Sequence, residues 1–177
     1  MGGVWKPNYY YTGELLHYGV KGMKWGVRKD KHAPNPYPDL TPEVVAALKT
    51  RRDKAIFFSG CNKYNRKGKL VRQSSQVANQ YAIAHGATTM SARLKKKHVS
   101  IPEWDFDDYA SVSKWEQASR AYASQASGKV RVIVGPNLRA NNIFETVELP
   151  VLKDNPNVTS VVMINSETGH KTIVFER

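Results

Sequence analysis

Residues 111–135 read "SVSKWEQASRAYASQASGKVRVIVG", a helical pattern that leads directly into a strand pattern. We expect a helix over about 109–127, because Trp115, Ser119 and Tyr122 share a face at i, i+4 and i+7 and Gly128 ends the pattern. The segment "KVRVIVG" then places Val130, Val132 and Val134 on one face, which predicts a buried strand. A helix that leads into a buried strand is typical of an α/β domain, in which ligands bind at the ends of strands.

Segments on both sides of this stretch continue the alternation of helices and strands. Thr41 is the expected N-cap of a first helix, with Pro42 at its first position and basic residues near its end. We predict further elements from cap, alternation and turn signals: a strand at 55–60, a loop at 61–69, a helix at about 75–85, an irregular segment at 87–108, and a hairpin of strands 158–165 and 170–176. No internal repeat is visible.

The composition limits the domain organisation. With 177 residues, 41% of them hydrophobic, the chain can bury one core and carry an additional arm. Residues 1–40 are rich in Gly, Pro, Lys, Tyr and Trp, and no helical or alternating period persists there. We therefore predict an extended or flexible basic arm over 1–40 and a folded domain over 41–177.

The charge is distributed unevenly along the chain. Residues 1–100 contain 19 Lys and Arg against 5 Asp and Glu, while residues 101–177 contain 8 against 10. A basic half can attract phosphate-bearing partners, including nucleic acid. A solvated basic surface that only keeps the protein soluble explains the same asymmetry, so the sequence leaves both interpretations open.

Other sequence signals argue against several classes of protein. We find no membrane-length apolar run and no secretory signal, so no membrane partner is expected. Cys61 is the only cysteine, which indicates a reducing compartment. The five histidines are scattered and no metal-binding or P-loop motif is present, so we expect neither a metal site nor a bound cofactor.

The stretch "NIFETVELPVL", residues 142–152, contains an unexpected carboxylate. Glu148 sits between Val147 and Leu149, where burial of a charge costs several kcal/mol unless the charge is paired or used. A solvated position is the ordinary explanation, because an isolated Glu in an apolar run is most often half exposed. The aromatic stripe of Trp115 and Tyr122 is also ambiguous, because such a stripe can be ordinary core or one wall of a ligand pocket. Glu116 and Arg120 are expected to form an outward i, i+4 ion pair beside it.

The order of several short segments resembles that of the ADP-ribosyl cyclase / NAD glycohydrolase family, in its disulfide-free bacterial or phage toxin-like branch. The segments that carry this resemblance are "FFSG" (57–60), "GATTMS" (86–91), "IPEWD" (101–105), residues 111–135 and "IFETVELP" (143–150). The resemblance covers about 95 residues. It implies an α/β fold with a small, mostly parallel sheet flanked by helices and a helical N-terminal part.

The same resemblance implies a reaction and its residues. These enzymes cleave the bond between nicotinamide and ribose in NAD, their substrate, to give ADP-ribose or cyclic ADP-ribose. Glu148 matches the catalytic glutamate, whose carboxylate would stabilise an oxocarbenium-like ribose. Trp115 matches the tryptophan that packs against nicotinamide. The remaining matches are substrate-binding positions, namely Phe58, Ser59, Ser91, Ser119 and Phe144.

Two positions depart from the family pattern. Ser91 stands where relatives have an acidic residue that grips the nicotinamide amide and influences the choice between hydrolysis and cyclisation. Gly60 stands where many relatives have an arginine, and Lys63, Arg66 or Arg93 could replace it at the pyrophosphate. A protein that only binds NAD or a cyclic nucleotide, without cleaving it, is therefore the alternative to an enzyme.

Residues 17–29, "HYGVKGMKWGVRK", resemble a segment that recurs in phage head-associated proteins. This resemblance implies a phage gene product that acts in the host cytoplasm, and it implies a possible virion or immunity-protein partner. A packaging signal, a flexible arm and contact with nucleic acid through Lys, Trp and Tyr all fit the segment. The last of these makes a basic phage-associated nucleic-acid-binding protein a further alternative.

Overall fold

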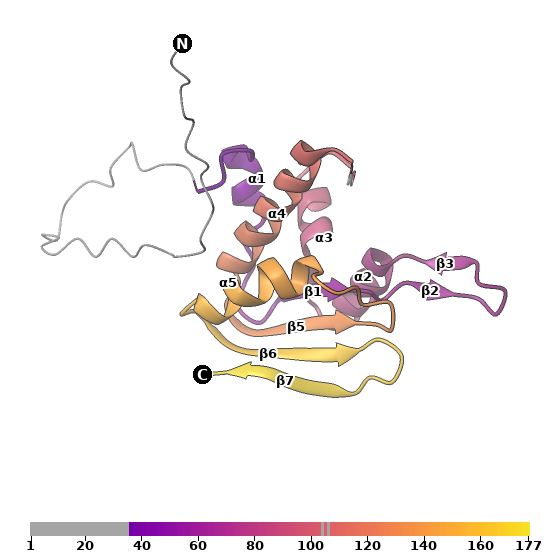
Figure 1. Ribbon diagram of the computed structural model, residues 1–177. Coiled ribbons are helices and arrows are strands. Elements are labelled where there is room, and N and C mark those ends of the chain that lie inside the picture. The colour runs from indigo at the N-terminus through magenta and orange to yellow at the C-terminus, as the bar shows by residue number, and fades with distance from the viewer. Residues whose placement is uncertain (1–35, 104, 106) are drawn as a thin grey trace, which may run out of the picture. The chain divides into compact units, whose positions relative to one another are not determined.

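A computed structural model describes residues 36–177, apart from Trp104 and Phe106 (Figure 1). It contains a five-stranded sheet in the order β4-β1-β5-β6-β7. The strands are β1 (Ala55–Ser59), β4 (Thr88–Thr89), β5 (Gly128–Val134), β6 (Val158–Asn165) and β7 (Lys171–Glu176). All neighbouring strands are parallel except β6 and β7, which are antiparallel. The predicted α/β class with a mostly parallel sheet is confirmed.

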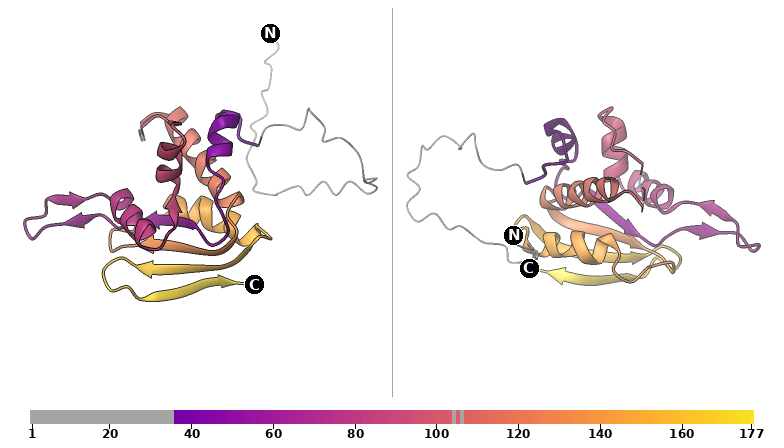
Figure 2. Two further views of the ribbon diagram at one scale, coloured as in Figure 1. Left: turned by 180° about the vertical axis from the view of Figure 1, so that it is seen from behind. Right: turned by 45° about the horizontal axis from the view of Figure 1, so that its top comes forward.

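Helices cover both faces of this sheet (Figures 1 and 2). They are α1 (Pro42–Ala47), α2 (Ser74–Ala84), α3 (Met90–Lys96), α4 (Tyr109–Ser124) and α5 (Leu149–Asp154), with a π-helical turn η1 (Phe144–Glu148) before α5. Residues of α1, α3, α4 and α5 join the core on one face, and α2 packs with Ile56 and Ile133 on the other. The alternating side chains of β1 serve both layers, since Phe57 belongs to the first core and Ile56 to the second.

The order of the strands determines where a ligand site can form. From β1 the chain crosses by way of α2 to β4 on one side, and then by way of α4 to β5 on the other side of β1. In open parallel sheets such a reversal leaves a crevice outside the carboxyl ends of the strands. The carboxyl end of β1, at Phe58 and Ser59, lies at this reversal.

The first helix begins as predicted but is shorter. The Thr41 side chain accepts a hydrogen bond from the Val44 amide at 3.4 Å, and Pro42 occupies the first helical position. The helix ends at Ala47, and the fully buried Leu48 is its C-cap. Lys49 and the following basic residues therefore lie beyond the helix, not in its last turn.

Two regions predicted to be irregular contain regular structure. The loop at 61–69 is part of an antiparallel hairpin, β2 (Lys63–Tyr64) and β3 (Leu70–Arg72), whose turn is closed by the Asn65 side chain accepting from the amides of Lys67 and Lys69. Residues 88–96 form β4 and α3, with Thr89 as the N-cap. The strand and the helix are both too short to show a clear period in the sequence.

The helix α4 is confirmed but ends at Ser124, three residues before the predicted end. The buried Asn155 side chain donates to the carbonyl groups of Ala123, Ser124 and Ala126, at 2.9 to 3.0 Å, and so satisfies the carboxyl end of the helix. The expected pair of Glu116 and Arg120 is not formed: within the part of the chain that the structure describes, the one ion pair joins Arg52 and Asp53.

Most of the predicted arm lies outside the described residues. Asn35–Arg177 form one compact unit, and Leu40 and Tyr37 already contribute to its core. Asp39 is bonded to α4, since the Ser113 hydroxyl donates to its carboxylate at 2.7 Å. Within the described residues, none of the helices has the length and apolar character needed to span a membrane.

Candidate functional site

A cavity of about 230 Å³ opens at the carboxyl end of β1. Its walls come from β1, α3, α4 and the turn η1, which are brought together by the crossing of the chain described above. All seven residues predicted from the sequence line it, namely Phe58, Ser59, Ser91, Trp115, Ser119, Phe144 and Glu148. Segments up to 90 residues apart in the sequence therefore meet in one site.

Glu148 is buried, with 8% of its surface exposed, so the solvated position considered above is wrong. Burial raises the pKa of its carboxyl group to about 8, and a hydrogen bond with the Ser119 side chain opposes that rise. The carboxyl is therefore mainly protonated at neutral pH in the free protein. A buried carboxyl group whose pKa is raised in this way favours a ligand that brings positive charge near it.

The turn η1 explains why Glu148 points into the site. The Leu149 amide donates to the Phe144 carbonyl, five residues earlier, which widens the turn. Pro150, the next residue, has no amide to continue an ordinary α-helical ladder, and a wide turn tolerates this. Phe144, 2% exposed, and Glu148 both line the cavity from this turn.

The helix α4 supplies a polar and an aromatic side chain from successive turns. Ser119 is buried beside Glu148. Trp115 is half-buried, and its indole Nε1 donates to the Pro102 carbonyl at 2.8 Å. This bond fixes the indole ring against the segment before the helix, so that the ring forms a rigid wall of the cavity.

Phe58 and Ser59 reach the cavity from the end of β1. The Ser59 hydroxyl donates to the side-chain oxygen of Asn142 at 3.2 Å. Asn142 also caps the next turn, because its side-chain oxygen accepts from the Glu145 amide. The strand end and the turn that holds Glu148 are therefore joined by a short polar bridge.

Ser91 enters the site from the first turn of α3, the helix that the sequence did not reveal. It is half-buried, and it also lines a second cavity of about 400 Å³ between α2 and α3. A serine at this place offers a hydroxyl where a carboxylate would offer a charge. The wall that α3 contributes to the cavity therefore holds no second ionised group.

Tyr122, which the sequence left open as core or as a pocket wall, also lines the cavity. Its hydroxyl donates to the Thr88 carbonyl at 2.7 Å, and its ring centroid lies 4.8 Å from that of Phe57. Burial raises the pKa of Tyr122 well above its usual range, so the phenol stays neutral. The i+7 spacing from Trp115 was a signal for this position, but the same spacing fits ordinary core equally well.

The three cations considered for a pyrophosphate do not line the cavity. Lys63 lies on β2, Arg66 lies in the turn of the hairpin, and the Arg93 Nε donates to the Ala47 carbonyl at 3.0 Å. Among the described residues, no group of three or more His, Cys, Asp and Glu side chains could hold a metal ion. The reactive and polar side chains that line the described cavity are one carboxyl group and several hydroxyl groups, beside aromatic walls.

Comparisons with known proteins give limited matches. Residues 10–32 match a family of unknown function, DUF7211, which overlaps residues 17–29 but assigns no activity. No curated protein matches the sequence at a significant level. The resemblance of residues 17–29 to phage head-associated proteins stays a prediction, and that segment lies outside the described residues.

Several solved structures are similar in fold. Aplysia cyclase complexed with substrate NGD and product cGDPR has a TM-score of 0.47 and 22% identity, over 66% of this chain and 50% of that chain. ADP ribosyl cyclase complexed with N1-cIDPR has a TM-score of 0.47 and 21% identity, over 66% and 51%. CD38 has a TM-score of 0.46 and 20% identity, over 70% of this chain and 54% of that chain. The chain thus spans about half the length of these solved chains.

Proposed function

We propose that this protein cleaves the bond between nicotinamide and ribose in NAD and releases nicotinamide. The observation that carries the proposal is Glu148, a buried carboxyl group of raised pKa in a small cavity beside the indole ring of Trp115. The order of sequence segments that resembles the ADP-ribosyl cyclase / NAD glycohydrolase family supports it independently.

The chemistry of the substrate matches these two side chains. The nicotinamide ring of NAD is a flat cation, and its departure leaves positive charge on the ribose. Trp115 offers a flat, electron-rich face to the ring. The pyridinium charge would lower the pKa of Glu148 in the complex, so that an ionised carboxylate faces the oxocarbenium-like ribose when the bond breaks.

The fate of the ribose cation decides the product. Attack by water gives ADP-ribose and a proton, and attack by the adenine ring of the same molecule gives cyclic ADP-ribose. Ser91 stands where the family resemblance implies an acidic residue that influences this choice. Ser91 offers no charge to the amide of nicotinamide. We therefore propose that the protein releases ADP-ribose, cyclic ADP-ribose or both, and we assign no ratio to them.

Incubation of the purified protein with NAD tests the proposal. We expect one nicotinamide to appear for each NAD consumed. The amounts of ADP-ribose and cyclic ADP-ribose should together equal the amount of nicotinamide. Chromatography separates all four compounds. A protein that binds NAD in calorimetry but releases no nicotinamide would instead be the non-catalytic nucleotide-binding protein named above.

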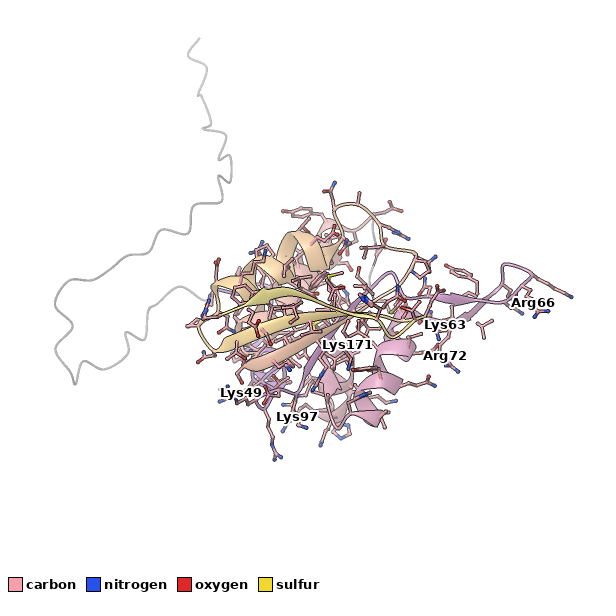
Figure 3. The ribbon with its side chains drawn as sticks, turned by 90° about the horizontal axis from the view of Figure 1, so that it is seen from below. Lys49, Lys63, Arg66, Arg72, Lys97 and Lys171 are labelled. Carbon is pink, nitrogen blue, oxygen red and sulfur yellow. The ribbon has the colours of Figure 1, made fainter. Side chains whose placement is uncertain are left out.

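The nucleic-acid alternative has one observation in its favour. Cationic side chains occur along the hairpin, where Figure 3 shows Arg66 at the far end and Lys63 and Arg72 nearer the base. This distribution fits a polyanion, but it does not account for a carboxyl group buried beside Trp115. We therefore rank nucleic-acid binding below NAD cleavage.

The biological setting is part of the proposal. A toxin-like effector that depletes NAD in the host cytoplasm fits the family resemblance, and a place in the virion fits residues 17–29. An immunity-type partner would be required wherever the producing cell shares the same NAD pool. Detection of the protein in purified virions would test the virion association.

Removal of residues 1–34 is expected to leave NAD cleavage within about threefold of the full chain. The cavity is lined by residues between Ile56 and Glu148, and the core begins at Tyr37. The shortened protein should begin at Asn35, since Leu40 is part of the core. Nicotinamide release and circular dichroism are measured on both proteins. A folded shortened protein without turnover would show that residues 1–34 belong to the active domain.

A further inference from the structure

The cavity is too small for the whole of a dinucleotide. At about 230 Å³ it lies below the roughly 300–1,000 Å³ typical of ligand pockets, so it suits a nicotinamide ring and its ribose. If NAD is the substrate, the adenosine diphosphate half must lie in an adjoining space. The inference below therefore rests on the proposed function.

Two spaces adjoin the cavity. A groove of about 900 Å³ shares Phe58 and Ile143 with it, and the second cavity of about 400 Å³ shares Ser91. The groove continues from the strand end at which Ser59 bonds to Asn142, because Asn142 also lines the groove. The cavity and the groove therefore adjoin beside one polar bridge.

The groove has the side chains that a nucleotide diphosphate requires. Hydroxyl and amide groups line it from the base of the hairpin, the start of α2 and the segment after β5, including Asn62, Ser75, Asn141 and Thr146. Among the described residues that line it, Arg139 is the one cation and Glu116 the one carboxylate. A guanidinium group suits a diphosphate, and a carboxylate suits the hydroxyl groups of a ribose.

The backbone explains why the cation comes from residue 139. Gly60, at the end of β1, has a φ of +61°, and a Cβ atom there would lie 2.4 Å from the Leu138 amide nitrogen. No side chain can therefore occupy position 60, because the segment 137–138 fills that space. The same segment leads directly to Arg139 at the wall of the groove.

We infer that the groove binds the adenosine diphosphate half of the substrate and that Arg139 binds its diphosphate. The apolar side chains of Leu70 and Val112 line the same groove and offer contact area for the adenine ring. The second cavity is the competing site, because Lys95 and Lys96 line it. The two sites can be separated, since Arg139 lines the groove whereas Lys95 and Lys96 line the second cavity.

The test uses ADP and nicotinamide as probes on the full chain. We expect Arg139→Gln to raise the Kd for ADP, measured by calorimetry, by about tenfold and to leave inhibition by nicotinamide unchanged. The KM for NAD should rise by a similar factor, with kcat within about threefold. The double variant Lys95→Gln with Lys96→Gln removes both cations from the second cavity, and we expect its affinity for both probes to stay within twofold of wild type. Arg139→Lys should recover part of the affinity.

The outcomes separate this inference from the proposed function. Wild-type affinity for ADP in Arg139→Gln, or a larger loss in the double lysine variant, would overturn the inference even if NAD is cleaved. An Arg139-dependent affinity for ADP in a protein that releases no nicotinamide would support the groove and remove the catalytic proposal. Unchanged thermal melting of the variants would show that a loss of binding is local.

Discussion

Glu148→Gln is expected to reduce kcat for nicotinamide release by roughly 100-fold or more, as for loss of a principal electrostatic group. Glutamine keeps the volume of the side chain and a hydrogen-bonding oxygen but cannot carry negative charge. The KM for NAD should change less, because the ribose develops its positive charge only as the bond breaks. Steady-state measurements of nicotinamide release give both quantities.

The stability of the same variant provides a control for its folding. The wild-type carboxyl has a pKa of about 8 in the folded protein against the ordinary value of 4.5. Ionisation of this carboxyl therefore takes little from the free energy of unfolding below pH 4.5, and the loss grows as the pH rises to 8. Relative to wild type, Glu148→Gln should gain free energy of unfolding on the order of 4 kcal/mol between pH 4.5 and pH 8.5.

Two results would contradict this account. A variant that cleaves NAD within about threefold of wild type would remove Glu148 from the mechanism. A stability difference that does not change with pH would mean that the carboxyl has an ordinary pKa and is not isolated in a dry cavity. A variant that melts as well as wild type but has lost turnover would support a chemical role over a structural one.

The positions of the site residues could be predicted because each lies on a segment with a strong local signal. Phe58 and Ser59 end an apolar strand, and the helix that carries Trp115 and Ser119 leads directly into the next one. A parallel sheet places the ends of such strands at one edge. The family resemblance added the order of the segments, which no single pattern could supply.

The conformation around Glu148 could not be predicted in the same way. Its neighbours in sequence are apolar on both sides, a pattern that fits a strand or a half-exposed helix. The wide turn depends on the bond between the Leu149 amide and the Phe144 carbonyl. It also depends on Asn142, which is bonded to Ser59 more than 80 residues away. Contacts at that separation leave no local pattern.

The groove was missed for a related reason. Its walls come from a hairpin predicted as a loop and from residues 139–142, which have no periodic pattern. Gly60 stands where many relatives have an arginine, and no local pattern distinguishes Arg139 from other cations as its replacement. The packing of segment 137–138 against Gly60 is a tertiary contact, and it is this contact that brings Arg139 to the groove.

The rate of NAD cleavage is expected to rise with pH across the neutral range. With a pKa of about 8, Glu148 is ionised in about 1% of free molecules at pH 6 and in most of them at pH 9. Since kcat/KM reports the ionisation of the free protein, it should increase by about 50-fold or more between pH 6 and pH 9. The rise in kcat should occur at lower pH, because the pyridinium cation of bound NAD favours the ionised carboxylate.

Ser119→Ala provides the matched variant for this pH dependence. The hydrogen bond with Ser119 lowers the pKa of Glu148, so its loss should move the rise in kcat/KM to higher pH. Ser59→Ala removes a hydroxyl group that is bonded to Asn142, and it should leave the pH midpoint of the rise in kcat/KM unchanged. A merely structural role for Ser119 would lower the rate at all pH values without moving the midpoint. A flat profile from pH 6 to pH 9 in the wild-type protein would show that ionisation of a buried Glu148 does not control the reaction.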